Sequence, residues 1–382
     1  MKKFLAVISA FLLSIAILPV RFCRAETLNS LPCKAAYLID YDSGTVLFEK
    51  NATTRLPIAS MCKIMTLLLC FESIDAGEHT LNEQVTVSQT AAGMGGSQVY
   101  LEANGSYEIS NLLKSIIVCS ANDSCVAMAE TIAGSENAFV ERMNERAKEL
   151  GANDTLFANC TGLPKEPQYS CAKDVSVMLQ ALLHHPQYFE YSKIRNEEFR
   201  HPKDRVTQMT NTNRLLRSYE GCDSGKTGFT NQAGFCLAAS AKRGNMRIIS
   251  VTIGSSDSTS RFDCHKNMLN YAFANFTNKV IVDADVPLNE RAEVRGGKQD
   301  YVKAKAKRNI LLFSKKGTQD NITEEVVFNG IKAPVRNGDV IGKIVVYKNN
   351  VEADSVELLA CEDIAKATVW DNYKEAADNW SW

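Results

Sequence analysis

The chain has 382 residues, of which 45% are hydrophobic and 23% are charged, and its formal net charge at pH 7 is -1. This length allows two or three domains. The charge balance supplies no basic excess to neutralise phosphates, which argues against nucleic acid as a main partner. The five histidines are scattered and no Cys-x-x-Cys pair occurs, so we expect neither a metal site nor another cofactor.

The first 25 residues have the pattern of a secretory signal peptide. Lys2 and Lys3 precede an apolar run from Phe4 to Val20, and the local sequence favours cleavage after Ala25. An uncleaved anchor helix is the alternative, because the apolar run approaches the length that spans a bilayer. Either interpretation places the rest of the chain outside the cytoplasm.

The chain contains twelve cysteines, which is many for an exported protein. Cleavage of the signal peptide would remove Cys23 and leave an odd number, so not all of the others can pair within the chain. Most of them stand inside apolar runs, where a cysteine usually acts as a small buried hydrophobic residue. The sequence does not predict a disulfide pattern.

Residues 26–275 are predicted to form an α+β domain, because helical patterns in the middle are flanked by strand patterns at both ends. A hairpin is expected at 35–50, with its turn at 42–44. The segment 60–71 is apolar on nearly every side, which is typical of a helix buried at the centre of a domain. Four further elements are expected: helices over 111–133 and 135–151, and adjacent strands over 234–240 and 246–254.

The composition changes near Thr277. Short strand patterns separated by turn signals fill 280–360, which predicts a small all-β domain over 276–361. The tail, 362–382, returns to helical propensity and holds all three tryptophans of the chain. It could be an amphipathic helix that contacts a membrane surface. Its excess of acidic residues opposes binding to anionic lipid, and the alternative is a helix that docks on the β domain.

The first motif that could carry chemistry is Ser60-Met61-Cys62-Lys63. Residues three apart share one face of a helix, so the Lys63 amine should lie beside the Ser60 hydroxyl. A serine hydroxyl needs an adjacent base to act as a nucleophile, and a lysine is a base only in its neutral form. The alternative is a purely structural role, in which Ser60 caps the helix and Lys63 lies on the surface. It fits poorly here because the residues that follow are apolar on every side.

Two further motifs follow along the chain. Ser120-Ala121-Asn122 stands at a break between apolar helical segments, where polar side chains can reach into a cleft. Lys226-Thr227-Gly228 stands beside the two predicted strands, and its glycine would let a strand backbone approach a substrate closely. Taken alone, this third motif is equally compatible with a surface turn that carries a solvated lysine.

The order of the three motifs resembles that of the active-site serine penicillin-recognising enzymes. Local sequence makes the resemblance closer: the chain is similar to the low-molecular-mass penicillin-binding proteins that are serine-type D-alanyl-D-alanine carboxypeptidases. The similar segments are Pro57-Ile58-Ala59-Ser60, Asn159-Cys160-Thr161-Gly162-Leu163, Asn211-Thr212-Asn213-Arg214-Leu215-Leu216 and Lys226-Thr227-Gly228-Phe229-Thr230. The resemblance implies a β-lactamase/transpeptidase-like domain followed by a small all-β domain.

The resemblance also implies a role for each matching residue. The substrate would be a peptidoglycan pentapeptide ending in D-Ala-D-Ala, and β-lactam antibiotics would be inhibitors. Ser60 would attack the carbonyl between the two D-alanines, with Lys63 as proton acceptor and Ser120 as proton relay. The expected substrate-binding residues are Asn122, Lys226, Thr227, Gly228, Phe229 and Arg247, the last of which could equally be an exposed strand charge.

Three other functions stay open. A β-lactamase is the nearest, because Glu166-Pro167 superficially resembles the site of a deacylating glutamate. The residues that follow do not continue that resemblance, and a β domain is foreign to β-lactamases. An endopeptidase acting on peptide cross-links is a second possibility. A non-catalytic scaffold that binds the cell wall is a third, although a degenerate protein would be expected to have lost at least one motif residue.

Overall fold

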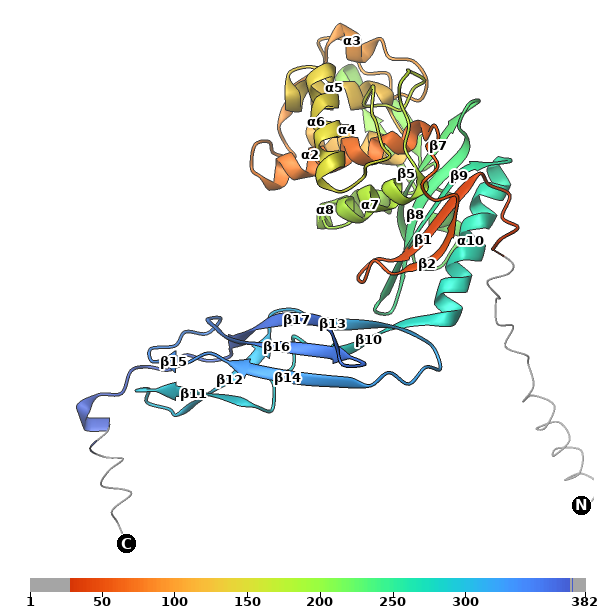
Figure 1. The fold of residues 1–382 in the computed structure, drawn as a ribbon. Helices are drawn as coiled ribbons and strands as arrows, with labels where there is room; N and C mark the ends of the chain where they lie inside the picture. Colours follow the sequence, from red (N-terminus) through yellow and green to blue (C-terminus); the bar gives the residue numbers. More distant parts are fainter. Residues whose placement is uncertain (1–27, 372, 374–382) are drawn as a thin grey trace, which may run out of the picture. The chain divides into compact units, whose positions relative to one another are not determined.

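The structure, a computed structural model, describes residues 28–371 and 373. The predicted signal peptide therefore lies outside the described residues, as do residues 372 and 374–382 of the predicted tail. The chain forms two compact units (Figure 1). Unit 1 comprises the chain up to Ile39, Val46–Ala241 and Ile248–Asn275; unit 2 comprises Asp40–Thr45, Lys242–Arg247 and the chain from Phe276 onward. Within the described part of the chain, no helix is both long and apolar enough to cross a membrane.

A five-stranded sheet in the order β2-β1-β9-β8-β7 forms the centre of unit 1. Its strands are β1 (Ala35–Asp40), β2 (Val46–Lys50), β7 (Cys222–Thr230), β8 (Gly234–Arg243) and β9 (Met246–Ser255). The expected hairpin at the start and the expected strand pair are thus confirmed. Most residues of β8 and β9 are buried, which agrees with their continuous apolar sequences. Strand β7 lies at one edge of the sheet, so part of its backbone is free to meet other groups.

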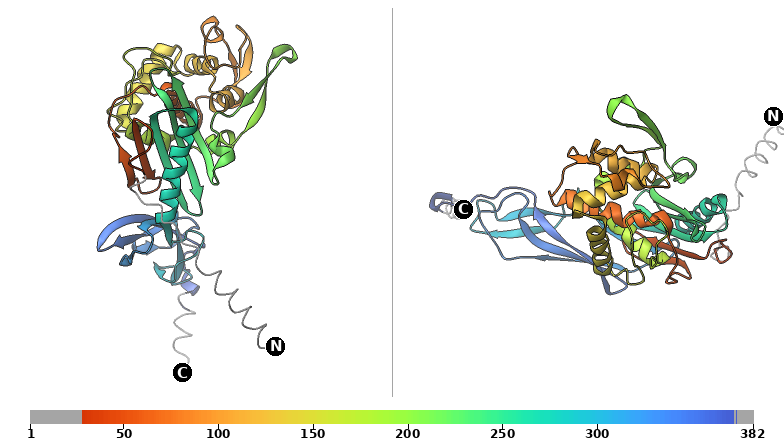
Figure 2. Two further views of the ribbon diagram at one scale, coloured as in Figure 1. Left: turned by 90° about the vertical axis from the view of Figure 1, so that its right-hand side faces the viewer. Right: turned by 90° about the horizontal axis from the view of Figure 1, so that it is seen from above.

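Helices cover both faces of this sheet. In Figures 1 and 2, α10 (Ser258–Asn275) crosses one face, and the cluster around α2 lies on the other. The remaining helices are α2 (Lys63–Asp75), α3 (Gln89–Ala92), α4 (Ile109–Val118), α5 (Asn122–Ala133), α6 (Glu136–Glu149), α7 (Ala172–Leu182), α8 (Pro186–Ser192) and α9 (Leu215–Ser218). Short hairpins are formed by β3 (Gln84–Thr86) with β4 (Ser106–Glu108) and by β5 (Asn196–Arg200) with β6 (Val206–Thr210).

Two of the predicted helices differ from the structure at their boundaries. The predicted buried helix is α2, which is preceded by a 3-10 turn at Ala59–Cys62. The helical pattern over 111–133 forms two helices, because the chain breaks between α4 and α5 at the Ser120 motif, where the sequence indicates a break. The next helix, α6, begins where expected: Ser135 caps it by accepting a hydrogen bond from Ala138 N.

Unit 2 from β10 onward is all β, as expected. Its strands are β10 (Phe276–Val282), β11 (Arg291–Arg295), β12 (Tyr301–Ala306), β13 (Ile310–Lys315), β14 (Ile322–Phe328), β15 (Ile331–Lys332), β16 (Val340–Lys348) and β17 (Val351–Ala360). Six of them form a sheet in the order β14-β16-β17-β12-β11-β15, and β10 pairs with β13. The core extends past the predicted boundary at 361, because Ile364 is 1% exposed and bridges to Val335.

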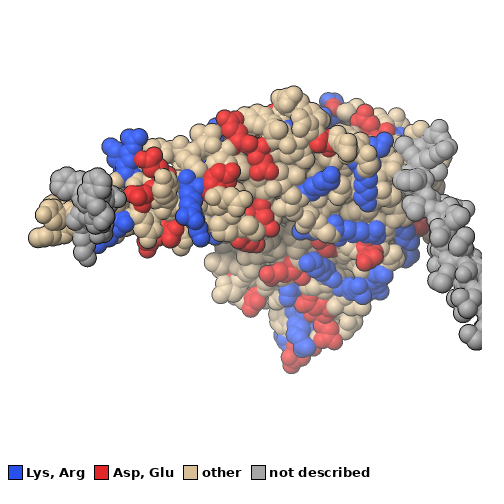
Figure 3. Space-filling view, turned by 90° about the horizontal axis from the view of Figure 1, so that it is seen from below, with Lys and Arg blue, Asp and Glu red and all other residues tan. Residues whose placement is uncertain are grey.

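None of the eleven cysteines in the described part of the chain forms a disulfide, and eight of them are buried. Cys70, Cys125 and Cys236 are completely buried, as expected of small hydrophobic residues. On the face of the molecule shown in Figure 3, basic and acidic side chains are interspersed, which agrees with the balanced composition.

Candidate active site

The 3-10 turn before α2 places Ser60 beside Lys63. The Lys63 side chain is 0% exposed, and its Nζ lies 3.0 Å from Ser60 Oγ. The Lys63 amine also donates to Asn122 Oδ1 at 2.7 Å and to the carbonyl oxygen of Thr161 at 2.6 Å. These contacts fix the amine against the serine hydroxyl, because three acceptors from different segments hold one nitrogen. The geometry is that of a nucleophile with a neighbouring base.

The break between α4 and α5 presents a second serine to the same site. Ser120 has a φ of 66°, which is uncommon for a residue other than glycine. The hydrogen bonds from Ala121 N to Ser115 O and from Asn122 N to Ser97 O hold the chain in this conformation. Strained backbone of this kind occurs preferentially at functional sites. The sequence suggested a break here but did not predict the left-handed residue.

Asn122 links Lys63 to the loop that precedes β4. Its amide nitrogen Nδ2 donates to Gly95 O at 2.7 Å, while its Oδ1 accepts from Lys63. The neighbouring Asp123 fixes the same loop, because its carboxylate accepts from Val99 N at 3.1 Å and from Leu101 N at 3.0 Å. The first turn of α5 thus positions one wall of the site.

Lys226 on β7 contacts Ser120. Its Nζ donates to Ser120 Oγ at 2.8 Å and to the carbonyl oxygen of Thr227 at 3.0 Å, and the side chain is only 1% exposed. Burial lowers the pKa of Lys226 well below its usual value, and the nearby positive charge of Lys63 lowers it further. The site therefore holds two Ser–Lys pairs, Ser60 with Lys63 and Ser120 with Lys226.

Strand β7 packs directly on the turn that carries Ser60. A Cβ atom on Gly228 would lie 2.7 Å from Ile58 O and 3.1 Å from Ser60 N. Only glycine therefore allows the edge strand to approach the backbone of Ser60 this closely. The next residue, Phe229, is 51% exposed, and its ring packs on Phe235 with the ring centres 4.4 Å apart.

A loop between α6 and α7 supports the Ser60 turn from another side. Gly162 has a φ of +80°, and a Cβ atom there would lie 2.0 Å from the Ala59 carbonyl oxygen. Asn159 Oδ1 accepts from Gly162 N at 2.7 Å and from Thr161 N at 3.2 Å. This loop therefore positions the Thr161 carbonyl to accept from Lys63. From the sequence, the loop was recognised only by its resemblance to the family.

The segment before α9 positions the Thr227 side chain. Thr227 Oγ1 donates to Thr212 Oγ1 at 2.7 Å. Asn213, which is 2% exposed, donates from Nδ2 to Ser224 O at 3.2 Å and accepts from Leu215 N at 3.1 Å. These bonds tie the segment to β7 on the Lys226 side of Gly228.

The structure does not bring Arg247 to the other predicted site residues. It stands at the start of β9, beyond the turn from β8, and its guanidinium lies 5.9 Å from the centre of the Tyr41 ring. Lys226, in contrast, is in the middle of β7, opposite Ala238. The structure therefore does not support the expectation that Arg247 binds substrate. That expectation placed Arg247 on the correct strand but did not consider its position along the strand.

Arg261 of α10 is the buried cation that the sequence did not reveal. It lies below β7 and β8, and its Nη1 donates to Gly228 O and to Cys236 O, both at 3.3 Å. Its Nε is buried without a hydrogen-bond partner. Burial lowers the pKa of Arg261 to about 10, so it stays charged at neutral pH. Its positive charge also contributes to the lowered pKa of Lys226.

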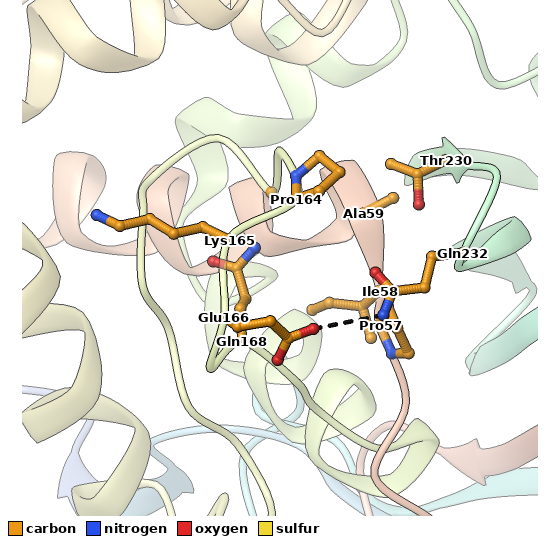
Figure 4. A pocket seen from close by; sticks show the side chains of 10 residues that line it. Pro57, Ile58, Ala59, Pro164, Lys165, Glu166, Gln168, Thr230 and Gln232 are labelled. Carbon is orange, nitrogen blue, oxygen red and sulfur yellow. Dashed lines mark hydrogen bonds between the residues drawn. The ribbon is translucent and has the colours of Figure 1, made fainter.

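A shallow pocket borders the Ser60 turn beyond the end of β7 (Figure 4). Ile58 and Ala59 line one side, Thr230 and Gln232 line another, and the loop that carries Glu166 closes it. Glu166 is exposed, and Gln232 Nε2 donates to its Oε1 at 3.4 Å. It is not part of the hydrogen-bonded cluster around Lys63, which is a geometric argument against a deacylating glutamate of the β-lactamase kind.

Comparison with known proteins identifies relatives along the whole chain. Residues 23–257 match the family model described as D-alanyl-D-alanine carboxypeptidase, and residues 276–366 match that of the penicillin-binding protein 5 C-terminal domain. The chain is 35% identical over 387 residues to D-alanyl-D-alanine carboxypeptidase DacF of Bacillus subtilis (strain 168). That alignment covers 100% of this chain and 99% of the relative.

Solved structures share the fold of both units. A peptidoglycan synthesis regulatory factor (PBP3) from Streptococcus pneumoniae has a TM-score of 0.74 at 27% identity, covering 88% of this chain and 100% of that one. Penicillin binding protein 5 from Haemophilus influenzae has a TM-score of 0.68 at 29% identity, covering 88% of this chain and 98% of that one. The expected architecture, an α+β transpeptidase-like domain followed by an all-β domain, is confirmed.

Proposed function

The chain belongs to the D-alanyl-D-alanine carboxypeptidase family of serine hydrolases, and from this premise we propose that Ser60 is its nucleophile. The observation that carries the proposal is the 3.0 Å contact between Ser60 Oγ and the buried Lys63 amine. In its neutral form, Lys63 can take the hydroxyl proton as the oxygen attacks the carbonyl between the two D-alanines. The peptide C–N bond then breaks and an ester on Ser60 is left.

Ser120 and Lys226 would serve the departing D-alanine. Its nitrogen needs a proton when the C–N bond breaks, and Ser120 Oγ can donate one while Lys226 Nζ, 2.8 Å away, resupplies it. The lowered pKa of Lys226 makes its ammonium a readier donor. Attack of water on the ester would then release the shortened peptide and restore the Ser60 hydroxyl.

Backbone and side-chain groups around β7 would bind the substrate. The close approach of β7 at Gly228 to the Ser60 turn brings the edge strand beside the nucleophile, where Ser60 N and Phe229 N can hold the oxyanion. Asn122 would bind the substrate amide. Thr227 would bind the terminal carboxylate. The positive charge of Arg261 beside the strand would attract that anion, because a buried charge is screened less by solvent.

The test of this proposal is release of D-alanine from Nα,Nε-diacetyl-L-Lys-D-Ala-D-Ala by the purified protein. We expect release that disappears in the Ser60→Ala variant, whose fold is checked by its unfolding temperature. A Ser170→Ala variant is the matched control, because Ser170 begins the second Ser-x-x-Lys sequence of the chain and its hydroxyl contacts Thr155 Oγ1, which is not a partner of Lys63. Equal release by the wild type and Ser60→Ala would refute Ser60 as nucleophile.

Acylation by β-lactams follows from the same geometry, and a solved relative is itself named a penicillin binding protein. A β-lactam carbonyl would be attacked by Ser60, but no leaving group would diffuse away, so the ester would persist. We expect a fluorescent penicillin to label the wild type covalently and to leave Ser60→Ala unlabelled in a denaturing gel. Rapid loss of the label would instead indicate β-lactamase turnover.

The location of the protein is also a proposal. The sequence at 1–25 supports export, which would place the enzyme where its peptidoglycan substrate is. Peripheral membrane contact through the C-terminal tail is supported by the exposure of Val369 (84%), Trp370 (79%) and Tyr373 (71%). Trp370 and Tyr373 also contact each other edge to face, so they present a small aromatic patch.

A further inference from the structure

The pocket beyond the end of β7 has no part in the reaction described above. It lies beside the Ser60 turn and is lined by Glu166. Glu166 is the residue whose Glu-Pro sequence resembles the site of a deacylating glutamate. In Figure 4, the Glu166 and Gln232 side chains point toward each other across the pocket, whereas Lys165 extends away from them. The chemistry of this pocket can be deduced from its position along β7 and from its charge.

The order of residues along β7 gives the direction of a bound substrate. Lys226 stands on one side of Gly228, and Thr230 stands on the other. Gly228 marks the level of the nucleophile, because a Cβ atom on it would lie 3.1 Å from Ser60 N. If the released D-alanine lies near Lys226 and Ser120, the acyl part of the peptide must continue toward Thr230 and the turn that carries Gln232.

The loop opposite this turn is held in place by its own hydrogen bonds. Gln168 Oε1 accepts from Ala158 N at 3.1 Å and from Asn159 N at 3.2 Å, and its Nε2 donates to Leu163 O at 3.1 Å. Asn159 Nδ2 donates to the same Leu163 carbonyl at 2.8 Å. Glu166 is therefore carried by a braced loop whose other end, at Gly162, packs on the Ser60 turn.

The Glu166 carboxylate has unused capacity to bind a cation. Among the residues that the structure describes, its single hydrogen-bond donor is Gln232 Nε2 at 3.4 Å, which is a long contact, and it has no ion-pair partner. A carboxylate can accept about four hydrogen bonds. The other polar groups that line the pocket are neutral or, in the case of Lys165, directed away from it.

Resting on the proposed function, we infer that this pocket receives the side chain of the residue that precedes D-Ala-D-Ala, and that Glu166 recognises a primary amine on it. That residue comes one position before the acyl D-alanine, so it is the next group along β7 past Phe229. The ligand class is a basic diamino acid with a free amino group, such as lysine. Gln232 would share the amine with Glu166, because its amide oxygen is a second acceptor.

The test compares two peptides that differ only in this amine, Nα-acetyl-L-Lys-D-Ala-D-Ala and its Nε-acetylated form. We expect wild-type kcat/KM to be about two- to fivefold higher for the free amine, the range of an exposed ion pair. The Glu166→Gln variant should lose this preference and cleave the Nε-acetylated peptide at the wild-type rate. The preference should also shrink at high ionic strength, because salt screens exposed charges.

Glu141→Gln is the matched control, since Glu141 is exposed on α6 away from the pocket, and it should keep the wild-type preference. The inference is overturned if the wild type cleaves both peptides equally or prefers the acetylated one. It is also overturned if Glu166→Gln keeps the preference for the free amine. If the wild type cleaves neither peptide while its fold is intact, the proposed function fails instead, so the two failures are distinguishable.

Discussion

Lys226 is buried in the site as one of two neighbouring lysines, and its burial has a consequence for stability. The unfolded chain keeps a proton on a lysine up to about pH 10.4, whereas the folded protein releases the Lys226 proton at lower pH. Between these two pH values the unfolded state binds more protons than the folded state. The free energy of unfolding must therefore rise with pH across this interval through Lys226.

A Lys226→Met variant should lack this contribution. The difference in free energy of unfolding, wild type minus variant, should increase from about pH 7 to about pH 9.5, by at most about 1.4 kcal/mol per pH unit. Urea unfolding at the two pH values measures it. Lys173→Met, at an exposed site on α7, is the matched control and should follow the wild type. A difference that stays constant with pH would show that folding does not change the affinity of Lys226 for its proton.

Gly162 provides a second prediction at the scale of one residue. Alanine there must adopt a left-handed conformation, which costs about 1–2 kcal/mol, and its methyl group would overlap the Ala59 carbonyl. Steric overlap adds about 1–3 kcal/mol. We expect Gly162→Ala to lower the free energy of unfolding and to slow labelling by fluorescent penicillin, because the loop must move away from Lys63.

Gly134→Ala separates the two causes. Gly134 has nearly the same φ, +79°, but nothing lies within 4 Å of an added Cβ. The free energy of unfolding of Gly134→Ala should fall only by the cost of the left-handed conformation, about 1–2 kcal/mol. The variant should keep the wild-type rate of labelling. Equal effects at both positions would contradict the close packing of the 159–162 loop on the Ser60 turn.

The sequence predicted the chemical groups of the site better than it predicted their neighbours. The motifs predict that Ser60, Lys63, Ser120, Asn122 and Lys226 lie together. Direct hydrogen bonds join them in two groups, Lys63 with Ser60 and Asn122, and Lys226 with Ser120. Their recognition depended on the spacing and order of short motifs. The role of the Thr161 carbonyl could not be predicted, because every residue has a backbone carbonyl and the residue type does not indicate which one is used. Nothing in the sequence around Arg261 distinguishes it from an ordinary helix residue. The distance of Arg247 from the site could not be predicted, because strand register depends on long-range pairing.

At the scale of elements, the interval between α4 and α5 shows where periodicity fails. The apolar pattern continues from one helix to the other, so hydrophobic periodicity alone favours one helix across Ser120, although the polar motif there indicates a break. Tertiary bonds override that preference: the Asp123 carboxylate and Asn122 N pull the start of α5 toward the 97–101 loop. The central strands and α2 were predictable, because each is apolar on all sides and must be buried.

An Asp123→Asn substitution tests how much this break depends on one carboxylate. The asparagine can keep one oxygen, but its NH2 group would face backbone N–H donors. We expect the free energy of unfolding to fall by about 1–3 kcal/mol, the cost of buried donors left unsatisfied, and penicillin labelling to slow. Asp204→Asn, at an exposed position, should change neither quantity. If the Asp123→Asn variant is as stable as the wild type but is labelled slowly, Asp123 positions the site without contributing to stability.

At the scale of the whole molecule, the change in sequence pattern near Thr277 marked the start of the all-β segment. The end of that segment was less predictable. Ile364 belongs to the β core, Gly297 bridges to Lys366, and Lys298 forms an ion pair with Asp371. A few residues that follow the last strand carry no periodicity, so the sequence assigned them to the tail.

This packing decides where the tail should be cut to test membrane contact. Deletion from 362 would remove Ile364 from the core, whereas deletion of 372–382 leaves it in place. We expect the shorter deletion to reduce sedimentation of the protein with vesicles of phosphatidylethanolamine and phosphatidylglycerol, and to leave D-alanine release unchanged. Undiminished sedimentation would exclude residues 372–382 as the attachment. A Val369→Ser/Trp370→Ser variant of the full chain would then test the exposed patch directly.

The exposed loop at 163–167 has a consequence for how such an enzyme can evolve. It is braced at Asn159 and Gln168, yet the residues between them carry no group of the Ser–Lys pairs. Mutations there can accumulate with little effect on folding or on bond cleavage. If the peptide composition of the cell wall changes during evolution, substitutions in this one segment can therefore change the substrate specificity. The residues that break the peptide bond can stay the same.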